Sequence, residues 1–360
     1  MAPRDHEEDD LTLHDLIEGP TRDLTSARAA ALAQTRSHPA PTPTRPAPDD
    51  HEVDGTSGDP QGSQLHDRPG ETAAGRRRVQ LERLPASGAL YRRALLGVVP
   101  GVGGRRGADV PGLELAVGGV AVDQRHLADY DRVCGFRLGD RLPATYLHVL
   151  GFPLSLRLMT GPGFPIPLTG VVHVANRITV HRPVEVGERV DFHTYAENLR
   201  PHERGRQLDV VLIGSIGGEE VWRGVSTYLG KERAAGGGPR RDRGDRPAPP
   251  AASALWRVTP RVGTDYARVS GDHNPIHTSK LGARLFGFPR PIAHGMWSKA
   301  RCLAALEPRL PEAYTVDVSF KLPVPLPSTV AFSASVIDTG WDFALHSARD
   351  GRPHLTGSVR

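Results

Sequence analysis

The chain contains two segments that resemble each other, and this internal repeat constrains its fold more than any other feature. YDRVCGF (residues 130–136) aligns with YARVSGD (residues 266–272), which lies 136 positions further on. RPVEVGERVDF (residues 182–192) aligns with LPVPLPSTVAF (residues 322–332), at an offset of 140. Because a nearly constant offset links two separate pairs of segments, we predict one structural module that is used twice.

Each half of the repeat shows the same order of elements. An apolar stretch comes first, at residues 145–160 in the first half and, with helical spacing, at 293–310 in the second. We expect Pro153 to break the first of these helices or to delay its start, because proline lacks the N–H donor that a helix interior requires. Period-two alternation predicts strands at residues 170–183, 189–199, 207–216, 220–229, 314–323, 329–338, 341–349 and 354–360.

Segments of different composition flank the two repeats. Residues 1–77 are poor in large apolar residues and rich in Pro, Asp, Arg, Thr and Ser, so they cannot bury enough apolar surface to offset the entropy of ordering. Residues 232–252 are rich in Gly, Pro and charge, as linkers are. The sequence therefore predicts a disordered N-terminal arm (1–77), a first module (78–231), a linker (232–252) and a second module (253–360).

A short run in the second module places an acid and a base on either side of a tight turn. Asp272 and His277 lie five positions apart, with Gly271 before the turn and Asn274 and Pro275 inside it. Glycine tolerates positive φ, and proline biases the residue before it away from helix. We expect a rigid loop, not a helix, in which the carboxylate and the imidazole face one small volume and hold a water molecule. The alternative is a surface turn that happens to carry a histidine.

This run resembles the hydratase-2 motif of the MaoC-like (R)-specific enoyl-thioester hydratases and dehydratases. That motif is an aromatic and an apolar residue, then S-G-D-x-N-P-[apolar]-H, with a small residue six positions further on. The residues that match it are Tyr266, Val269, Ser270, Gly271, Asp272, Asn274, Pro275, Ile276, His277 and Ala283. The resemblance continues through GFPRPIAHGM (residues 287–296). It implies an α+β double hot-dog fold, in which two modules, each a central helix wrapped by an antiparallel sheet, share a continuous sheet.

The resemblance also implies a reaction and the roles of several residues. The reaction is the reversible syn addition of water to a trans-2-enoyl thioester, which gives a (3R)-hydroxyacyl thioester. Asp272 and His277 would be the catalytic pair, and the sequence leaves open which of them performs each proton transfer. The N–H of Gly295 would bind the thioester oxygen at the positive end of a helix dipole, and Asn274 would steady the loop or the reacting groups. His294 would either cap this helix or act directly.

The first module lacks the acid–base pair. Phe136 stands at the position aligned with Asp272, and Arg141 stands at the position aligned with His277. By resemblance to double hot-dog hydratases, this module would keep the fold and line the substrate channel. Phe136 either lines that apolar acyl channel or belongs to the core.

Charge and cysteine content argue against several other classes of protein. A net charge of +4 is small for 360 residues and is not gathered into a stripe, so we expect no nucleic-acid partner. Two cysteines outside any metal-ligand spacing predict neither a disulfide framework nor a metal site, and the motif requires no cofactor. The sequence has no apolar run long enough to cross a membrane and no basic leader before an apolar stretch, so we expect a cytoplasmic protein. Its partners would be enoyl or 3-hydroxyacyl substrates on CoA or acyl carrier protein, and it would act alone or as a homodimer.

Two other functions remain open at this point. A hot-dog thioesterase would share the fold, although an intact Asp-x-Asn-Pro-x-His run argues against it. A non-catalytic acyl-thioester-binding subunit would recruit partners through the N-terminal arm, and the complete acid–base pair disfavours it. Lys299, Lys321 and Arg290 are either contacts for the phosphates of the thioester carrier or ordinary solvated charges.

Overall fold

The computed structural model describes residues 75–96, 107–168, 171–231 and 248–360. The predicted arm lies almost entirely outside the described residues, and so does most of the predicted linker. What the sequence predicts for those two segments stays a prediction.

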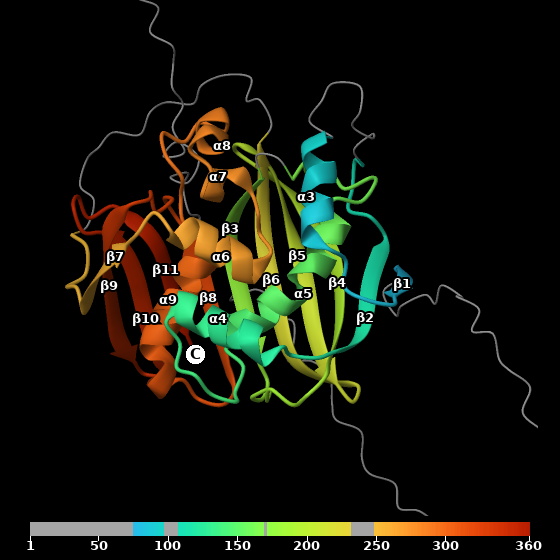
Figure 1. The fold of residues 1–360 in the computed structure, drawn as a ribbon, viewed down its shortest axis with the longest axis horizontal. Coiled ribbons are helices and arrows are strands. Elements are labelled where there is room, and N and C mark those ends of the chain that lie inside the picture. Colours follow the sequence, from blue (N-terminus) through green and yellow to red (C-terminus); the bar gives the residue numbers. More distant parts are fainter. Residues whose placement is uncertain (1–74, 97–106, 169–170, 232–247) are drawn as a thin grey trace, which may run out of the picture. The chain divides into compact units, whose positions relative to one another are not determined.

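Eleven strands form one sheet in the described part of the chain (Figure 1), in the order β1-β2-β4-β5-β6-β3-β8-β11-β10-β9-β7. Their bounds are β1 Arg77–Leu81, β2 Leu113–Val120, β3 Val171–Val180, β4 Val190–His202, β5 Gly205–Ile216, β6 Glu219–Lys231, β7 Ala254–Val258, β8 Tyr314–Phe320, β9 Ser328–Ile337, β10 Gly340–Ser347 and β11 Pro353–Val359. Neighbours pair antiparallel, except that β1 pairs parallel with β2. All eight strands that the alternating pattern predicts are present.

Two long buried helices pack against this sheet. The helices of the described ranges are α3 Ser87–Leu96, α4 Gln124–Cys134, α5 Ala144–Met159, α6 Val262–Ser270, α7 Pro275–Thr278, α8 Lys280–Leu285 and α9 Gly295–Leu306, with a 3-10 turn at Glu307–Arg309. The helix α5 contacts β4 and β5, and α9 contacts β10. These are the two central helices that the apolar stretches predict.

The order of the sheet displays the repeat. The strands β3 and β8 pair at its middle, and each step outward adds equivalent strands of the two modules: β6 and β11, β5 and β10, β4 and β9, β2 and β7. The aligned segments occupy equivalent places, because α4 and α6 both end at a glycine with positive φ, Gly135 at 82° and Gly271 at 71°. Tyr130 and Tyr266 face each other with ring centroids 6.3 Å apart. The continuous sheet of a double hot dog is therefore confirmed.

The helix α5 differs from the prediction at Pro153. It runs without a break from Ala144 through Pro153 to Met159, and 12 of its 16 residues are buried. Gly151 allows β5 to approach closely, because a Cβ at that position would lie 2.6 Å from the side chain of Leu212. Packing on nearly all sides of the helix thus outweighs the cost of about 3 kcal/mol that an interior proline imposes.

A buried lysine on α9 joins the central helix to both modules. Lys299 has 0% exposure, and its Nζ donates to Oδ1 of Asn176 at 2.6 Å and to the carbonyl oxygens of Asn176 and Val316 at 3.1 and 3.2 Å. These acceptors belong to β3 and β8, the two strands at the junction. Since all three ammonium donors are used and none is exposed, Lys299 is neither a phosphate contact nor a solvated charge, and that sequence-based expectation is wrong.

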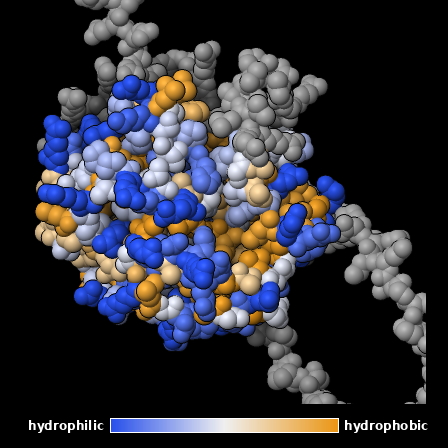
Figure 2. All heavy atoms as spheres, in the orientation of Figure 1, coloured by the Kyte–Doolittle hydropathy of each residue, from blue (hydrophilic) through white to orange (hydrophobic). Residues whose placement is uncertain are grey.

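Charged and polar residues cover much of the face shown in Figure 2, with apolar residues exposed between them. The large apolar side chains that are exposed among the described residues are Leu138, Leu255, Leu281, Leu285 and Val336. Within the described ranges, no helix is long and apolar enough to span a membrane.

Candidate active site

The acid–base pair lies where α6 ends and α7 begins. The αL conformation of Gly271 (φ 71°) terminates α6, and the chain turns through Asp272. Asn274 then caps α7 by accepting a backbone N–H, and Pro275 occupies the first helical position, where its missing N–H costs nothing. His277 therefore lies on a single helical turn and not in the loop that the sequence predicts. The Asn-Pro pair starts a helix as readily as it starts a turn.

Several neighbours hold the Asp272 carboxylate. Its Oδ1 accepts the phenolic O–H of Tyr91 at 2.5 Å and the backbone N–H of Asn274 at 3.2 Å. The backbone N–H of Asp272 donates to Oγ of Ser270 at 3.2 Å. Oδ2 has no hydrogen bond within the described residues, and Nε2 of His294 lies 3.9 Å from it. Oδ2 is thus the oxygen that remains for a ligand.

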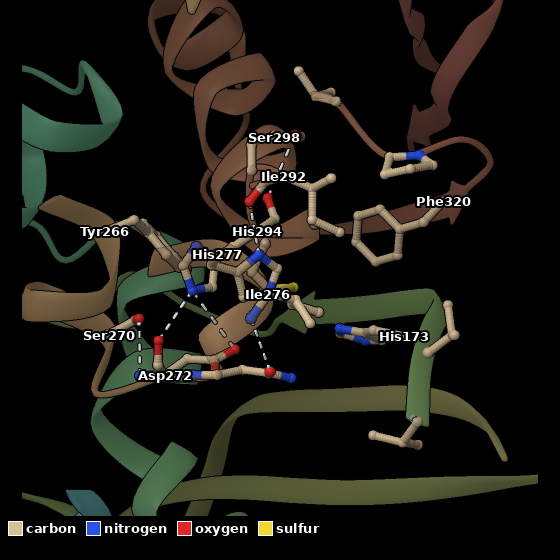
Figure 3. A pocket seen from close by; sticks show the side chains of 18 of the residues that line it. His173, Tyr266, Ser270, Asp272, Ile276, His277, Ile292, His294, Ser298 and Phe320 are labelled. Carbon is tan, nitrogen blue, oxygen red and sulfur yellow. Dashed lines mark hydrogen bonds and ion pairs between the residues drawn. The ribbon is translucent and has the colours of Figure 1, made fainter. Parts of the chain in front are cut away.

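Two imidazoles stack beside this carboxylate (Figure 3). The ring centroids of His277 and His294 are 3.7 Å apart. Nδ1 of His277 lies 2.8 Å from the carbonyl oxygen of Ile292, so Nδ1 carries the proton and Nε2 presents a lone pair. Nε2 of His294 lies 3.0 Å from the carbonyl oxygen of Asp272. This hydrogen bond connects the loop that carries Asp272 to the start of α9. Its side chain does not cap α9, contrary to one of the two roles that the sequence left open.

Burial determines the protonation states in the site. It lowers the pKa of His277 and lowers that of His294 to about 3, so both imidazoles are neutral near pH 7. Burial raises the pKa of the Asp272 carboxyl, but the two imidazoles, the Tyr91 hydroxyl and the Asn274 N–H outweigh it and hold that pKa below its ordinary value. Burial and the Asp272 charge together raise the pKa of Tyr91. An ionised carboxylate therefore lies beside a neutral imidazole with a free lone pair.

The same three side chains form a cluster of metal-ligand type. Asp272, His277 and His294 each offer one ligand atom, and these atoms lie within 4.8 Å of one another. Catalytic zinc sites use three protein ligands. Here Nε2 of His294 already bonds to a backbone carbonyl, and its Nδ1 is buried without a partner. Besides the buried Nδ1 of His294, two acceptors remain for a ligand in this arrangement, Oδ2 of Asp272 and Nε2 of His277, and they suffice to hold a water molecule.

Gly295 begins α9 at the edge of the same cavity. As the first residue of a helix, its N–H has no intrahelical acceptor, and the described residues provide no other. A Cβ at Gly295 would lie 3.1 Å from the ring of Phe320, so a larger residue there would crowd the cavity. The structure thus brings Gly295 together with Asp272, Asn274 and His277, the four residues that the sequence singles out.

Both modules form the cavity, which has a volume of about 200 Å³. The first module contributes from α3, α5, β3 and β6; these residues include Tyr91, His148, Val149, Phe152, Met159, Val171, His173 and Tyr228. The second module contributes the acid–base loop, the start of α9 and the end of β8. Tyr91 escaped the sequence analysis because it lies 181 positions before Asp272 and belongs to no motif. The only sequence feature that could have pointed to Tyr91 was the apolar Leu90-Tyr91 pair, which indicates a buried position.

Phe136 and Arg141 lie outside this cavity. Phe136 stacks on Tyr130 at 6.2 Å, and with Arg141 it lines a separate pocket of about 140 Å³. Arg141 is ion-paired with Glu185 and Glu312. Of the two roles left open for Phe136, packing against the core is therefore confirmed and the acyl channel is wrong, because the repeat places the equivalent loop of the first module at a different pocket. The first module lines the cavity mainly through α5 and β3 instead.

Comparison with known proteins agrees with this architecture. The model of the family "MaoC like domain" matches residues 248–348. The 3-hydroxyacyl-thioester dehydratase X of Mycobacterium tuberculosis is 40% identical over 269 residues, which cover 74% of this chain and 95% of that protein. The crystal structure of HtdX of Mycobacterium tuberculosis superposes with a TM-score of 0.62 at 39% identity and covers 69% of this chain and 99% of that one. A MaoC-like dehydratase from Phytophthora capsici superposes with a TM-score of 0.57, covering 68% and 94%, and at 18% identity it shows a shared fold alone.

The continuous sheet with two central helices defines a protein of the double hot-dog class. The family match and the 40% identity over nearly the whole length of a relative identify it further. The chain belongs to the MaoC-like dehydratase family.

Proposed function

We propose that Asp272 and His277 catalyse the reversible syn hydration of trans-2-enoyl thioesters to (3R)-hydroxyacyl thioesters. As a MaoC-like dehydratase the chain is a hydro-lyase of fatty acid metabolism, since its relatives are named as a 3-hydroxyacyl-thioester dehydratase and an enoyl-CoA hydratase 2. One observation carries the assignment of residues. An ionised carboxylate and a neutral imidazole present their free acceptors to one cavity, beside the start of a helix.

These two acceptors hold the reacting water. Oδ2 of Asp272 and Nε2 of His277 are the atoms that remain after the loop has made its internal hydrogen bonds. A water molecule that donates one hydrogen to each acceptor directs an oxygen lone pair towards C3 of the enoyl group. Because both acceptors lie on the same side of the substrate, water adds to one face of the double bond.

His277 accepts the proton from this water. The pKa of Asp272 is held below that of an ordinary carboxyl, so Asp272 stays ionised, and its negative charge stabilises the imidazolium that forms. One O–H bond of the water breaks, the water oxygen bonds to C3, and the proton on Nε2 passes to C2 on the same face. Dehydration runs through the same steps in reverse, so no other proton donor is required.

Gly295 stabilises the charge that develops on the thioester oxygen. Its free N–H and the positive end of the α9 dipole lie at the cavity edge. One such donor typically contributes about 3–4 kcal/mol to the stabilisation of the transition state. Tyr91, Asn274 and His294 act through Asp272 by fixing the direction of its carboxylate and of the loop that carries it.

The acyl group is carried by CoA or by acyl carrier protein. Of the three cationic side chains considered from the sequence, Lys321 is the candidate for contact with the carrier, because it is half-buried and lines the cavity. Arg290 is exposed and donates to the carbonyl oxygen of Pro327.

The direct test follows the loss of enoyl-thioester absorbance with crotonyl-CoA and with a longer trans-2-enoyl-CoA, followed by chiral analysis of the product. We expect an (R)-3-hydroxyacyl product from the unmodified protein and a loss of about 10²–10⁴-fold in its rate of formation by Asp272→Asn. The variant Asp342→Asn is the matched control, since Asp342 forms an ion pair with Arg360 away from the cavity. Release of free CoA without hydration would instead show a thioesterase, and binding without turnover would show an acyl-thioester-binding subunit.

A further inference from the structure

The first module contributes three neighbouring polar side chains to the cavity that the proposed reaction does not use. They are His148 of α5, His173 of β3 and Tyr228 of β6, and we call them the polar wall. The ring centroid of His173 lies 4.7 Å from that of Tyr228 and 6.5 Å from that of His148. The three rings therefore form one continuous surface.

The protein satisfies the hydrogen-bonding groups of this wall only in part: His173 bonds to the backbone of Ala175, and the Tyr228 hydroxyl bonds to Ser226. Nε2 of His173 is buried without a partner. His148 is only 7% exposed, and in the described part of the chain no hydrogen bond reaches its ring nitrogens. Buried polar groups in native proteins are nearly always paired, and unpaired ones at a cavity are normally completed by a ligand or by water.

A β-bulge directs His173 into the cavity. The pairing of β3 with β6 shifts register between His173 and Ala175, so Val174 is an extra residue in β3. Bulges of this kind re-aim a side chain and are frequent next to active sites. Figure 3 shows the His173 ring extending into the cavity towards Ile276.

The chemistry of the wall matches an uncharged oxygen. Burial lowers the pKa of His148 to about 4 and that of His173 to about 3, so both rings are neutral. A neutral imidazole offers one N–H donor and one lone pair, which complement a hydroxyl or a carbonyl group. A carboxylate or a phosphate would instead call for a cationic partner, and the Asp272 charge at the same cavity would repel it.

The position of the wall assigns this oxygen to the acyl chain. The ring of His173 lies 5.0 Å from that of Phe320, and Phe320 packs directly over Gly295. The ring of Phe320 therefore separates the polar wall from Gly295, where the thioester oxygen is proposed to bind. His148 and Tyr228 are each 7% exposed and Nε2 of His173 is buried, whereas the carrier of the thioester must leave the cavity towards solvent.

We propose that the polar wall binds an uncharged oxygen substituent of the acyl chain, a hydroxyl or oxo group beyond C3, and so selects oxygenated acyl thioesters over plain alkyl ones. This inference rests on the proposed function, because that function places the thioester at Gly295. An alkyl chain against the wall leaves His148 and Nε2 of His173 dehydrated and without a partner. Sites built to bond a substrate hydroxyl reject the analogue that lacks it for this reason.

The test compares trans-2-octenoyl-CoA with its analogues that carry a hydroxyl or an oxo group on C5, C6 or C7. At least one oxygenated analogue should show a kcat/KM about tenfold to hundredfold above that of octenoyl-CoA. His148→Leu should lower kcat/KM for that analogue and raise it for octenoyl-CoA, whereas His148→Gln, which keeps a donor and an acceptor, should retain part of the preference. His193→Leu is the matched control, since His193 lies on β4 and does not line the cavity.

Equal kcat/KM values for octenoyl-CoA and all its analogues in the unmodified protein would overturn the inference and leave the hydratase function intact. A preference that survives in His148→Leu would overturn it as well. If His148→Leu lowers kcat/KM equally for all CoA esters but not for N-acetylcysteamine thioesters, the wall binds the pantetheine arm and the inference is wrong. If no enoyl thioester is hydrated at all, the proposed function fails, and the inference fails with it.

Discussion

Replacement of Tyr91 by phenylalanine removes a single oxygen atom from the active site. The ring of Tyr91 packs with Leu90 and Leu156 in a small apolar cluster. The phenylalanine ring of the variant makes the same contacts and therefore occupies the same position. The lost contact is the O–H that donates to Oδ1 of Asp272 at 2.5 Å. Asp272 then keeps the backbone N–H of Asn274 as the donor to that oxygen.

The expected loss is large because the acceptor is charged. A hydrogen bond to an ionised group contributes about 1.5–3 kcal/mol, which corresponds to a factor of about 10–150. We expect this factor to appear mainly in kcat, because Tyr91 orients a group that acts on the reacting water. KM should change less, since Tyr91 is not proposed to bind the acyl chain.

The same change should shift the pH dependence of the reaction. The Tyr91 hydroxyl helps to lower the pKa of Asp272, so its removal moves that pKa upward. Protonation of His277 and protonation of Asp272 both end activity on the acid side, and the step that reports Asp272 should move to a higher pH in Tyr91→Phe than in the unmodified protein. A structural defect alone would lower the rate without moving this acid limb.

Enoyl-CoA hydration measured across the acid and neutral range tests both expectations. Tyr146→Phe serves as the control, because the Tyr146 hydroxyl bonds to Nδ1 of His126 and does not line the cavity. If Tyr91→Phe keeps the kcat of the unmodified protein and the same acid limb, the hydroxyl does not orient Asp272, and our account of the carboxylate is refuted.

Three further predictions concern the catalytic pair, the oxyanion donor and the buried histidines. Asp272→Asn and His277→Gln should each lower kcat by about 10²–10⁴-fold, measured by enoyl-CoA hydration; a smaller loss would place the acid–base work elsewhere. Gly295→Ala should lower kcat by more than about tenfold, because the new Cβ would press against Phe320 and crowd the N–H that binds the thioester oxygen; unchanged kinetics would exclude this donor. The pKa values of His148, His173, His277 and His294 are lowered by burial, so the unfolded chain binds more protons than the folded one once the pH falls below about 6.5. Stability should therefore decrease with acidification, by up to about 1.4 kcal/mol per pH unit for each of these histidines, until the pH approaches the folded pKa values; urea unfolding at neutral and mildly acidic pH measures this slope, and a flat profile would contradict the neutral state of the rings.

Local chemistry explains why much of the catalytic loop is predictable. Asp272, Asn274, His277 and Gly295 fall within one short stretch, and their placement depends on a glycine turn, an Asn-Pro cap and a helix start that neighbouring residues specify. Eight of the eleven strands in the described residues follow from the alternating sequence pattern in the same way, whereas β1, β2 and β7 were not predicted. The two misjudged elements, the helix at Pro153 and the helical turn at His277, are places where one sequence signal is compatible with two local structures.

The amino-acid sequence by itself determined the repeat, eight of the strands, the two central helices and the acid–base motif, because each is written in the pattern of residues within short segments of the chain. Only the tertiary structure decided that Tyr91 donates to Asp272 and that His148 and His173 line the cavity. It alone also decided that Lys299 bonds to the strands at the junction of the two modules and that Phe136 lines a different pocket. It also decided the protonation states, since burial and charged neighbours shift a pKa only after folding has brought distant segments together. The pairing of β3 with β8 is the physical reason, because it sets the first module against the second and completes a cavity that neither forms alone.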